Sequence, residues 1–102
     1  MDETKLFQTS VLDQLTKTKI YLRLHQQSAR RSRTLVEGLD DDLDLHRMCR
    51  HMKKSFNTNG NVIDDKIIQF QGDQRQNTRD WLVAQEILTE SEAKERIVFC
   101  GV

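Results

Sequence analysis

The chain has 102 residues, of which 36% are hydrophobic and 31% are charged, with 16 basic and 16 acidic side chains. This length predicts one domain with a modest core, and the composition excludes wholesale disorder. No apolar run reaches the length of a membrane span, and no signal-peptide core follows the acidic start, so we expect a protein of the cytosol or nucleus. A net charge of zero argues against a general nucleic-acid coat protein.

The charged residues are nevertheless clustered along the sequence. A basic group within residues 23–33 is followed by acids within residues 40–44 and by a second basic group within residues 47–54. This local polarity is compatible with docking on an RNA surface at one edge of the molecule. The alternative is a set of solvated faces that bind no partner.

The first third of the chain predicts a tail and a β-hairpin. Residues 1–18 are expected to be a flexible tail or to carry one weak helical stripe, formed by Leu6, Phe7, Val11, Leu12 and Leu15. Residues 19–26 alternate between apolar and polar side chains, which predicts a half-buried strand. Residues 27–33 are predicted to be a polar, Arg-rich connector, and residues 34–37 the returning strand, which ends at Gly38.

Residues 39–56 are predicted to form a helix because their apolar side chains recur at helical spacing. The expected core face consists of Leu45, Met48, Cys49, Met52 and Phe56. Asp42 or Asp44 is expected to cap the N-terminus of this helix. Residues 57–60 form a strong signal for the end of this helix, and Gly60 is suited to a positive φ.

The second half of the chain predicts a hairpin, a helix and a last strand. Residues 61–64 and 66–71 are expected to pair around a tight reversal, and residues 74–86 to form a helix. Residues 87–94 are predicted to be a connector in which one helical turn starts at Thr89 as an alternative, because Thr89 and Glu92 have the spacing of a capping box. Residues 96–100 are predicted to be the last strand.

The helix of residues 74–86 carries its own start signal. Asp73 is expected to be its N-cap, with Gln76 completing a capping box. Trp81 is expected to be the largest apolar anchor of this helix in the core. The element order β-β-α-β-β-α-β then predicts an α+β fold, a two-layer sandwich of one mostly antiparallel sheet with two helices packed on one face.

The sequence carries no recognisable catalytic, nucleotide-binding or metal-binding motif. Its three histidines lack a shared metal-ligand spacing, and its four glycines form no phosphate-binding loop. Cys49 and Cys100 stand far apart without a CxxC motif, which favours free thiols over a disulfide or a metal pair. We therefore expect neither an enzyme nor a cofactor or metal site.

The Arg-rich connector is the most interesting candidate for a binding site. Arg30, Arg31 and Arg33 are expected to protrude from a sheet edge. Arginine forks at such a place match phosphate oxygens and stack on the bases of structured RNA. The alternative is a charged loop that only discourages edge-to-edge pairing of the sheet.

Several motifs, in order from about Ile20 to Val102, resemble the eukaryotic translation initiation factor 1 family. The most specific is the string IIQFQGDQR at residues 67–75. Other matching strings are Val36-Glu37-Gly38, Lys53-Lys54 with Phe56, and Asn59-Gly60-Asn61-Val62. The resemblance makes residues 19–102 an initiation factor 1-like domain behind the tail of residues 1–18. The chain departs from the family at Ala29, where a glycine is expected in the hairpin turn.

The resemblance implies a monomeric, cytoplasmic factor that binds the small ribosomal subunit near the peptidyl site, close to mRNA and initiator tRNA and beside other initiation factors. Such a factor promotes scanning and enforces start-codon selection. The implied rRNA-binding residues are Arg30, Arg31, Arg33, Arg50, Lys53 and Lys54, and the residues implied in start-site fidelity are Asp73, Gln74 and Arg75. The alternative is a related small-subunit-docking domain used in recycling, reinitiation or viral control of host translation.

Overall fold

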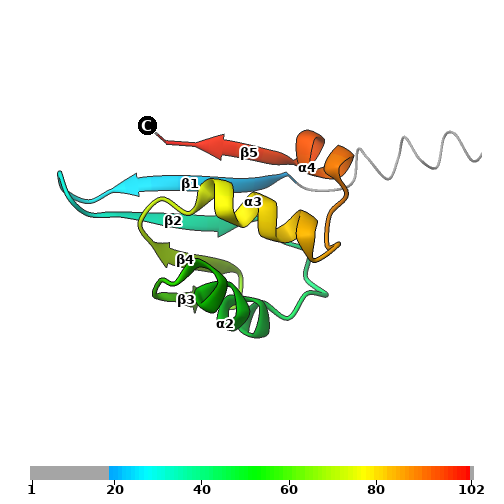
Figure 1. Ribbon diagram of the computed structural model, residues 1–102, viewed down its shortest axis with the longest axis horizontal. Coiled ribbons are helices and arrows are strands. Elements are labelled where there is room, and N and C mark those ends of the chain that lie inside the picture. The colour runs from blue at the N-terminus through cyan, green and yellow to red at the C-terminus, as the bar shows by residue number, and fades with distance from the viewer. Residues whose placement is uncertain (1–18, 102) are drawn as a thin grey trace, which may run out of the picture.

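The computed structural model describes residues 19–101, so the predicted tail of residues 1–18 lies outside the described residues (Figure 1). Within these described residues, five strands form one sheet in the order β3-β4-β2-β1-β5. Their bounds are Ile20–Gln26 for β1, Ser32–Glu37 for β2, Gly60–Ile63 for β3, Ile67–Gln71 for β4 and Ile97–Cys100 for β5. Neighbouring strands are antiparallel except β1 and β5, which are parallel, so the sheet is mixed and mostly antiparallel.

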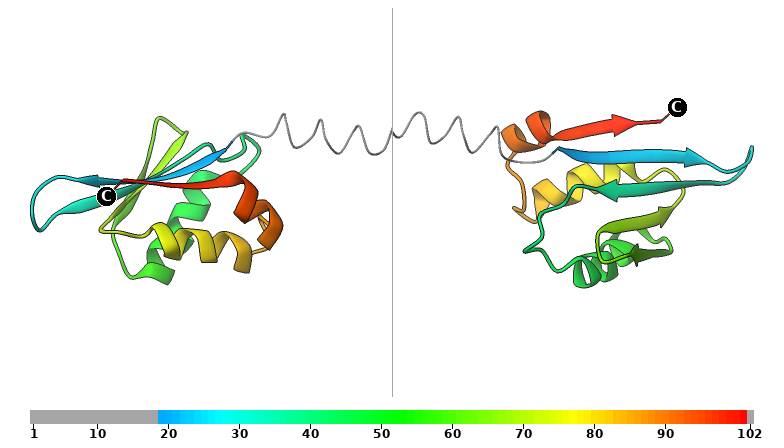
Figure 2. Two further views of the ribbon diagram at one scale, coloured as in Figure 1. Left: turned by 90° about the horizontal axis from the view of Figure 1, so that it is seen from above. Right: turned by 180° about the vertical axis from the view of Figure 1, so that it is seen from behind.

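The helices of residues 19–101 lie on one face of this sheet and leave its other face uncovered (Figure 2). Within residues 19–101 they are α2 (Leu45–Phe56), α3 (Arg75–Ala84) and α4 (Glu90–Arg96). The predicted α+β sandwich is thereby confirmed. Its one addition is α4, which occupies most of the predicted connector of residues 87–94. The Thr89 hydroxyl accepts the Glu92 N–H at 3.1 Å and the Glu92 carboxylate accepts the Thr89 N–H at 3.0 Å, which completes the capping box.

The alternation along each strand decides which side chains enter the core. On β2, Thr34 and Val36 are fully buried under the helices, while Arg33 and Leu35 point to the uncovered face. On β4, Ile68 and Phe70 are fully buried in the same layer. Strand β2 begins at Ser32, two residues earlier than predicted, because residues 32 and 33 still pair with β1. Arg33 is therefore a strand residue and does not belong to the loop.

Helix α2 has the predicted core face but different ends. Leu45, Met48, Cys49 and Met52 are buried, and Phe56 packs against them. The helix begins at Leu45, and not at residue 39, because Asp44 has extended backbone angles and its carboxylate accepts the Arg47 N–H at 3.1 Å. The open choice between Asp42 and Asp44 is thus decided for Asp44.

The residue with positive φ at the end of α2 is Asn57, and the prediction for Gly60 was wrong. Asn57 has φ 52° and its N–H bonds back to the last turn of the helix. Asparagine tolerates this left-handed conformation better than most residues. Gly60 is instead the first residue of β3, where a Cβ would lie 2.7 Å from the Gln69 carbonyl oxygen and from the Phe70 ring. Close packing against β4, and not a left-handed backbone, is therefore the reason for a glycine at this position.

Two further predictions concern single side chains. Cys49 is buried, Cys100 is half-buried, and both are free thiols, as predicted. Burial raises the pKa of the Cys49 thiol. Trp81 packs against the core but stays half-buried, whereas Leu82 and Thr78 are the residues that α3 buries completely. Trp81 therefore covers the core from the side.

Candidate nucleic-acid interface

The β1–β2 hairpin projects beyond the rest of the sheet, and its tip carries two exposed arginines (Figure 1). The tip closes with the Gln27 and Ser28 N–H groups donating to the Arg31 carbonyl oxygen at 2.8 and 3.1 Å. None of residues 27–31 has a positive φ. Ala29 therefore fits where a glycine was expected, because this turn needs no left-handed residue. Arg30 and Arg31 are held at the far end of a paired ribbon.

Arg33 lies one step back from the tip, on the uncovered face of β2. Its guanidinium donates to the Gln69 side-chain oxygen on β4 at 3.0 Å. The Gln69 amide in turn donates to the Asn61 side-chain oxygen on β3 at 3.2 Å. A ladder of polar side chains thus crosses three strands and orients Arg33 beside the tip arginines.

A second basic cluster lies at the C-terminal end of α2. Arg50, Lys53 and Lys54 line a shallow hollow of about 490 Å³ together with residues 57–59 and Gln71. The negative end of the helix dipole favours Lys53 and Lys54 in the last turn without any ligand. The helix dipole alone therefore explains why two lysines lie here. Whether they can bind a partner depends on whether acidic side chains of the protein neutralise them.

The two basic clusters are neighbours in space. A hollow of about 480 Å³ is lined by Arg30, Arg31 and Arg33, and it shares the residues Asn59 and Gln71 with the hollow at α2. The Asn59 amide donates to the Gln71 side-chain oxygen at 3.4 Å, which joins the two hollows. We call this surface the basic track; its members are Arg30, Arg31, Arg33, Arg50, Lys53, Lys54, Asn59 and Gln71.

All six cations predicted to bind rRNA therefore lie on one surface. Sequence reasoning missed Asn59 and Gln71, which it assigned only to a turn and a strand. Their amides carry no charge and stand 12 positions apart in the chain. The only signal that could have found them is the pairing of Gln71 beside Asn59 at the end of the β3–β4 ladder, and that register depends on the Asp64–Asp65 turn.

The charge of the basic track is not neutralised by the protein itself. No acidic side chain lines either hollow, and within residues 19–101 none of the six cations forms an ion pair. Four arginines elsewhere do have acidic partners: Arg23 with Glu37, Arg75 with Asp73, Arg79 with Glu90, and Arg96 with Asp40. A chain of zero net charge thus presents one uncompensated positive surface.

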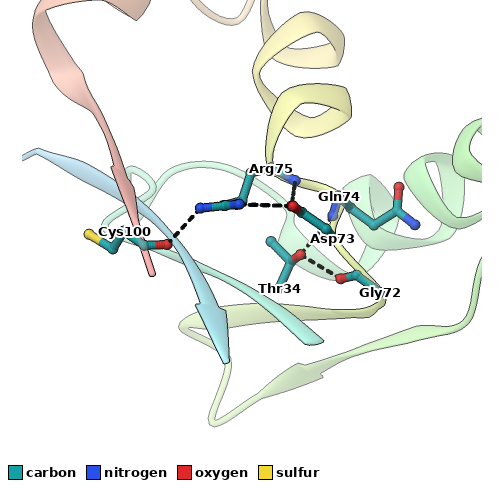
Figure 3. A network of polar contacts seen from close by, with 6 residues as sticks. All are labelled: Thr34, Gly72, Asp73, Gln74, Arg75 and Cys100. Carbon is teal, nitrogen blue, oxygen red and sulfur yellow. Dashed lines mark hydrogen bonds and ion pairs between the residues drawn. The ribbon is translucent and has the colours of Figure 1, made fainter. Parts of the chain in front are cut away.

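The predicted fidelity residues form the corner between β4 and α3 (Figure 3). Thr34, fully buried on β2, organises it: its hydroxyl donates to the Gly72 carbonyl oxygen and accepts the Gln74 N–H, both at 2.7 Å. Gly72 makes the turn with φ 82°. The Gly72 N–H donates to the Ser32 carbonyl oxygen at 2.8 Å, which fastens the corner to the first residue of β2, directly behind the hairpin tip.

Arg75 ties this corner to the last strand. Its guanidinium holds the Asp73 carboxylate through two hydrogen bonds of 2.9 and 2.8 Å and donates to the Cys100 carbonyl oxygen at 3.1 Å (Figure 3). These hydrogen bonds lower the pKa of Asp73 and raise the pKa of Arg75. Asp73, Gln74 and Arg75 thus bond mainly to the protein itself.

The predicted capping box of Asp73 and Gln76 was wrong. Helix α3 begins at Arg75, and Gln74 occupies the N-cap position without a side-chain cap. The Asp73 carboxylate accepts the Arg75 backbone N–H at 3.3 Å as well as the Arg75 guanidinium, and the Gln76 amide donates to Asp80 at 3.0 Å, so neither half of the box forms. A local spacing rule failed here because a stronger charged partner lies within reach of the carboxylate.

The part of the chain that the structure describes holds no group of three or more His, Cys, Asp or Glu side chains placed to bind a metal ion. None of its helices has the length and apolar character needed to cross a bilayer. The fold and this surface define a small α+β domain with a projecting hairpin and one cationic side.

The chain matches the family described as translation initiation factor SUI1 over residues 16–88. It is 36% identical over 74 residues to eukaryotic translation initiation factor eIF-1 of Saccharomyces cerevisiae, covering 69% of this chain and 68% of that protein. It is 39% identical over 67 residues to eIF1 of Drosophila melanogaster, covering 62% of this chain and 61% of that protein. The chain therefore belongs to the SUI1 family of translation initiation factors, which are not enzymes.

The fold also resembles the crystal structure of the C-terminal domain of human eIF2D. The TM-score is 0.61 at 20% sequence identity, and the match covers 79% of this chain and 42% of that one. At this identity the likeness concerns the fold alone.

Proposed function

We propose that this chain binds the small ribosomal subunit near the peptidyl site, promotes scanning and enforces start-codon selection. Its domain of residues 19–102 acts as a monomer in the cytoplasm, close to mRNA and initiator tRNA and in contact with other initiation factors. Membership of the SUI1 family supports the role in translation initiation. The observation that carries the choice of docking surface is the basic track, whose six cations have no ion-pair partner within residues 19–101.

The basic track suits structured rRNA for physical reasons. Arg30 and Arg31 stand at the end of a projecting ribbon and reach into a groove or cleft that a flat surface cannot enter. Lys53 and Lys54, at the end of α2 on the same surface, add point charges that bind further phosphates of the rRNA. The amides of Asn59 and Gln71 between the two clusters supply neutral hydrogen bonds.

The mechanism we propose is competition between two states of the subunit. The factor binds the open, scanning-competent state and thereby opposes accommodation of the initiator tRNA at a mismatched codon. Correct codon pairing favours the closed state, for which the factor has lower affinity, and the factor leaves. A ligand shifts such an equilibrium only by the difference between its affinities for the two states.

Asp73, Gln74 and Arg75 contribute to start-site fidelity indirectly in this proposal. They shape the corner whose Gly72 N–H bonds to Ser32, the residue that separates Arg31 from Arg33. Loosening the corner shifts the start of β2, directly behind the hairpin tip, and so misplaces the tip arginines on rRNA. These residues therefore position the docking surface without touching the ribosome.

Binding of the chain to purified small ribosomal subunits, measured by filter binding at several salt concentrations, tests the docking surface. The double variant Arg30→Ala/Arg31→Ala should bind more weakly, and its salt slope should fall by roughly 0.7–0.9 for each lost phosphate contact. The matched control is Lys66→Ala/Lys94→Ala, which removes the same charge from two exposed lysines that do not line the basic track. Equal affinity of the two variants would remove the docking surface from the proposal.

A reporter that compares initiation at AUG and UUG codons tests the role in start-codon selection. The intact chain should suppress UUG initiation, and the Arg30→Ala/Arg31→Ala variant should suppress it less. A chain that binds the subunit but leaves the UUG to AUG ratio unchanged would favour the alternative, a docking domain used in recycling, reinitiation or viral control of host translation.

A further inference from the structure

The hollow of about 480 Å³ behind the hairpin tip is lined by more amide side chains than cations. Its cations are Arg30, Arg31 and Arg33, and its carboxamides are Gln27, Asn59, Asn61, Gln69 and Gln71. An RNA phosphate only accepts hydrogen bonds, and the arginines already supply donors for it. The amides carry acceptors as well as donors, so they suit a different part of an RNA strand. We call this hollow the amide hollow.

Hydrogen bonds between strands hold these amides in place. The Arg33 guanidinium donates to the Gln69 side-chain oxygen at 3.0 Å, and the Gln69 amide donates to the Asn61 side-chain oxygen at 3.2 Å. At the end of the β3–β4 ladder, the Asn59 amide donates to the Gln71 side-chain oxygen at 3.4 Å. The Gln71 backbone N–H also donates to the Asn59 carbonyl oxygen at 3.0 Å, which keeps these two residues adjacent. The remaining polar atoms are therefore oriented before a ligand binds.

The Asn59–Gln71 pair leaves one acceptor and one donor open. Within residues 19–101, neither the Asn59 side-chain oxygen nor the Gln71 side-chain nitrogen has a hydrogen-bond partner. Both side chains are exposed and line the amide hollow. Because a hydrogen bond joins the two amides, the open acceptor and the open donor lie on neighbouring side chains. One flat ligand can therefore contact both of them.

An acceptor beside a donor complements the edge of an adenine base. Adenine presents its N6 amino group as a donor next to N7 as an acceptor, and asparagine or glutamine amides recognise this pair of groups. Guanine presents two acceptors, O6 and N7, on the same edge and pairs best with an arginine. RNA exposes such base edges to proteins mainly in single-stranded loops and bulges. The amide hollow has room for one such nucleotide, since small-molecule sites usually measure roughly 300–1,000 Å³.

We propose that the amide hollow binds one unpaired adenosine of the small-subunit RNA. The Asn59 side-chain oxygen accepts a hydrogen bond from the adenine N6 amino group, and the Gln71 side-chain nitrogen donates to N7. Arg30 and Arg31 hold the flanking phosphates. This inference rests on the proposed function, in which the basic track docks on rRNA, and it adds a preference for one base to a surface otherwise defined by charge.

NMR titrations of the full-length ¹⁵N-labelled chain with single-stranded RNA pentamers test the base preference. The pentamers have the sequence UUXUU, where X is A, G, C, U or 7-deazaadenosine. We expect the A pentamer to bind roughly 5–100-fold more tightly than the U pentamer, the range that one bidentate amide–base contact supplies. The 7-deaza pentamer lacks the N7 acceptor and should lose most of this preference. The side-chain amide signals of Asn59 and Gln71 should shift most with the A pentamer.

The variant Gln71→Met keeps the length of the side chain and removes its amide. It should bind the A and 7-deaza pentamers equally, and its salt slope should match that of the unchanged chain because no charge is lost. The matched control is Gln85→Met, at an exposed glutamine that does not line the amide hollow. This control should keep the full preference for adenine. The backbone amide spectra of both variants verify that residues 19–101 keep their fold.

Three outcomes would overturn the inference. Equal affinity for all five pentamers would mean that the hollow reads charge alone. Tighter binding of another base would mean that other groups of the hollow contact the base. An undiminished adenine preference in Gln71→Met would leave the Asn59–Gln71 pair with a structural role only. Failure of the proposed function is distinguishable, because a chain that prefers the A pentamer but does not bind small subunits would overturn the docking and not the base preference.

Discussion

At the scale of single residues, the corner between β4 and α3 depends on the side chains of Thr34, on β2, and of Arg75, the first residue of α3. The buried Thr34 hydroxyl satisfies the Gly72 carbonyl and the Gln74 N–H, so these two polar groups of the tight bend have partners. Arg75 then connects Asp73 to the end of β5. The corner is stabilised by hydrogen bonds that involve a charge, which are about twice as strong as neutral ones.

The Asp73–Arg75 pair makes a prediction about pH. Hydrogen bonds from Arg75 lower the pKa of Asp73 from its ordinary value of 3.8. A carboxyl whose pKa is lower in the folded state stabilises the fold above its unfolded pKa, and this contribution is lost as the pH falls through the folded pKa. We expect Asp73→Asn to reduce the free energy of unfolding at about pH 6 by less than about 1 kcal/mol, because the carboxylate is half exposed, and the difference should shrink as the pH falls through the folded pKa.

Urea unfolding curves of both proteins across this pH range provide the measurement. Asp41→Asn, which removes an exposed carboxylate without an ion-pair partner within residues 19–101, controls for the loss of one negative charge. A difference between Asp73→Asn and the unchanged chain that stayed constant from neutral to acidic pH would contradict the assignment.

At the scale of elements, each helix start is decided by a different partner. α2 begins where a carboxylate caps it, α4 begins with a reciprocal capping box, and α3 begins without a side-chain cap. At the start of α3 the Gln74 N–H donates to the Thr34 hydroxyl on β2, and the Arg75 N–H donates to the Asp73 carboxylate. A tertiary contact thus adds to a local one at the helix start that adjoins the proposed fidelity residues.

The cap of α2 can be tested against a close neighbour in the sequence. Asp44→Ala should lower the free energy of unfolding by about 1 kcal/mol, because the Arg47 N–H loses its acceptor. Asp42→Ala removes an equally exposed acid two residues away and should cost less than about 0.5 kcal/mol. Urea midpoints followed by circular dichroism measure both, and equal losses would show that general charge near the helix start, and not the cap, stabilises α2.

At the scale of the whole molecule, one end of the sheet collects segments that are far apart in the sequence. The Lys19 ammonium donates to the Glu95 carbonyl oxygen at 2.6 Å, and the nearly buried Arg96 guanidinium pairs with Asp40 at 3.0 Å. Gly38 packs against Lys19 at the same end. These contacts join the start of β1, the exit of β2 and the end of α4, opposite the projecting hairpin tip (Figure 2).

Gly38 provides a test of this close packing. Gly38 and Gly72 both have positive φ, 89° and 82°, so an alanine costs about 1–2 kcal/mol in backbone strain at either place. At Gly38 the new Cβ would also overlap the Lys19 carbonyl oxygen, whereas at Gly72 the nearest atom is the Gln74 side-chain nitrogen at 3.6 Å. We expect Gly38→Ala to lose about 1–3 kcal/mol more than Gly72→Ala in urea unfolding. Equal losses would contradict the close approach.

Much of the fold could be predicted because its signals are local. Alternation along residues 19–26 and the apolar spacing from Leu45 to Phe56 depend on neighbours within one or two turns of the chain. The errors arose where a distant or stronger partner intervened. Asp73 accepts the Arg75 backbone N–H and guanidinium and forms no capping box with Gln76, and Asn57 takes the left-handed conformation that was expected of Gly60.

For the candidate site, the sequence by itself determined which residue types are present and that they fall into two basic groups, since charge is a property of each residue. Only the tertiary structure decided that the two groups share one surface and that Asn59 and Gln71 lie between them. The physical reason is strand pairing. The order β3-β4-β2-β1 brings the end of α2 close to the start of β2 behind the hairpin tip, and no local sequence pattern predicts that these segments are neighbours.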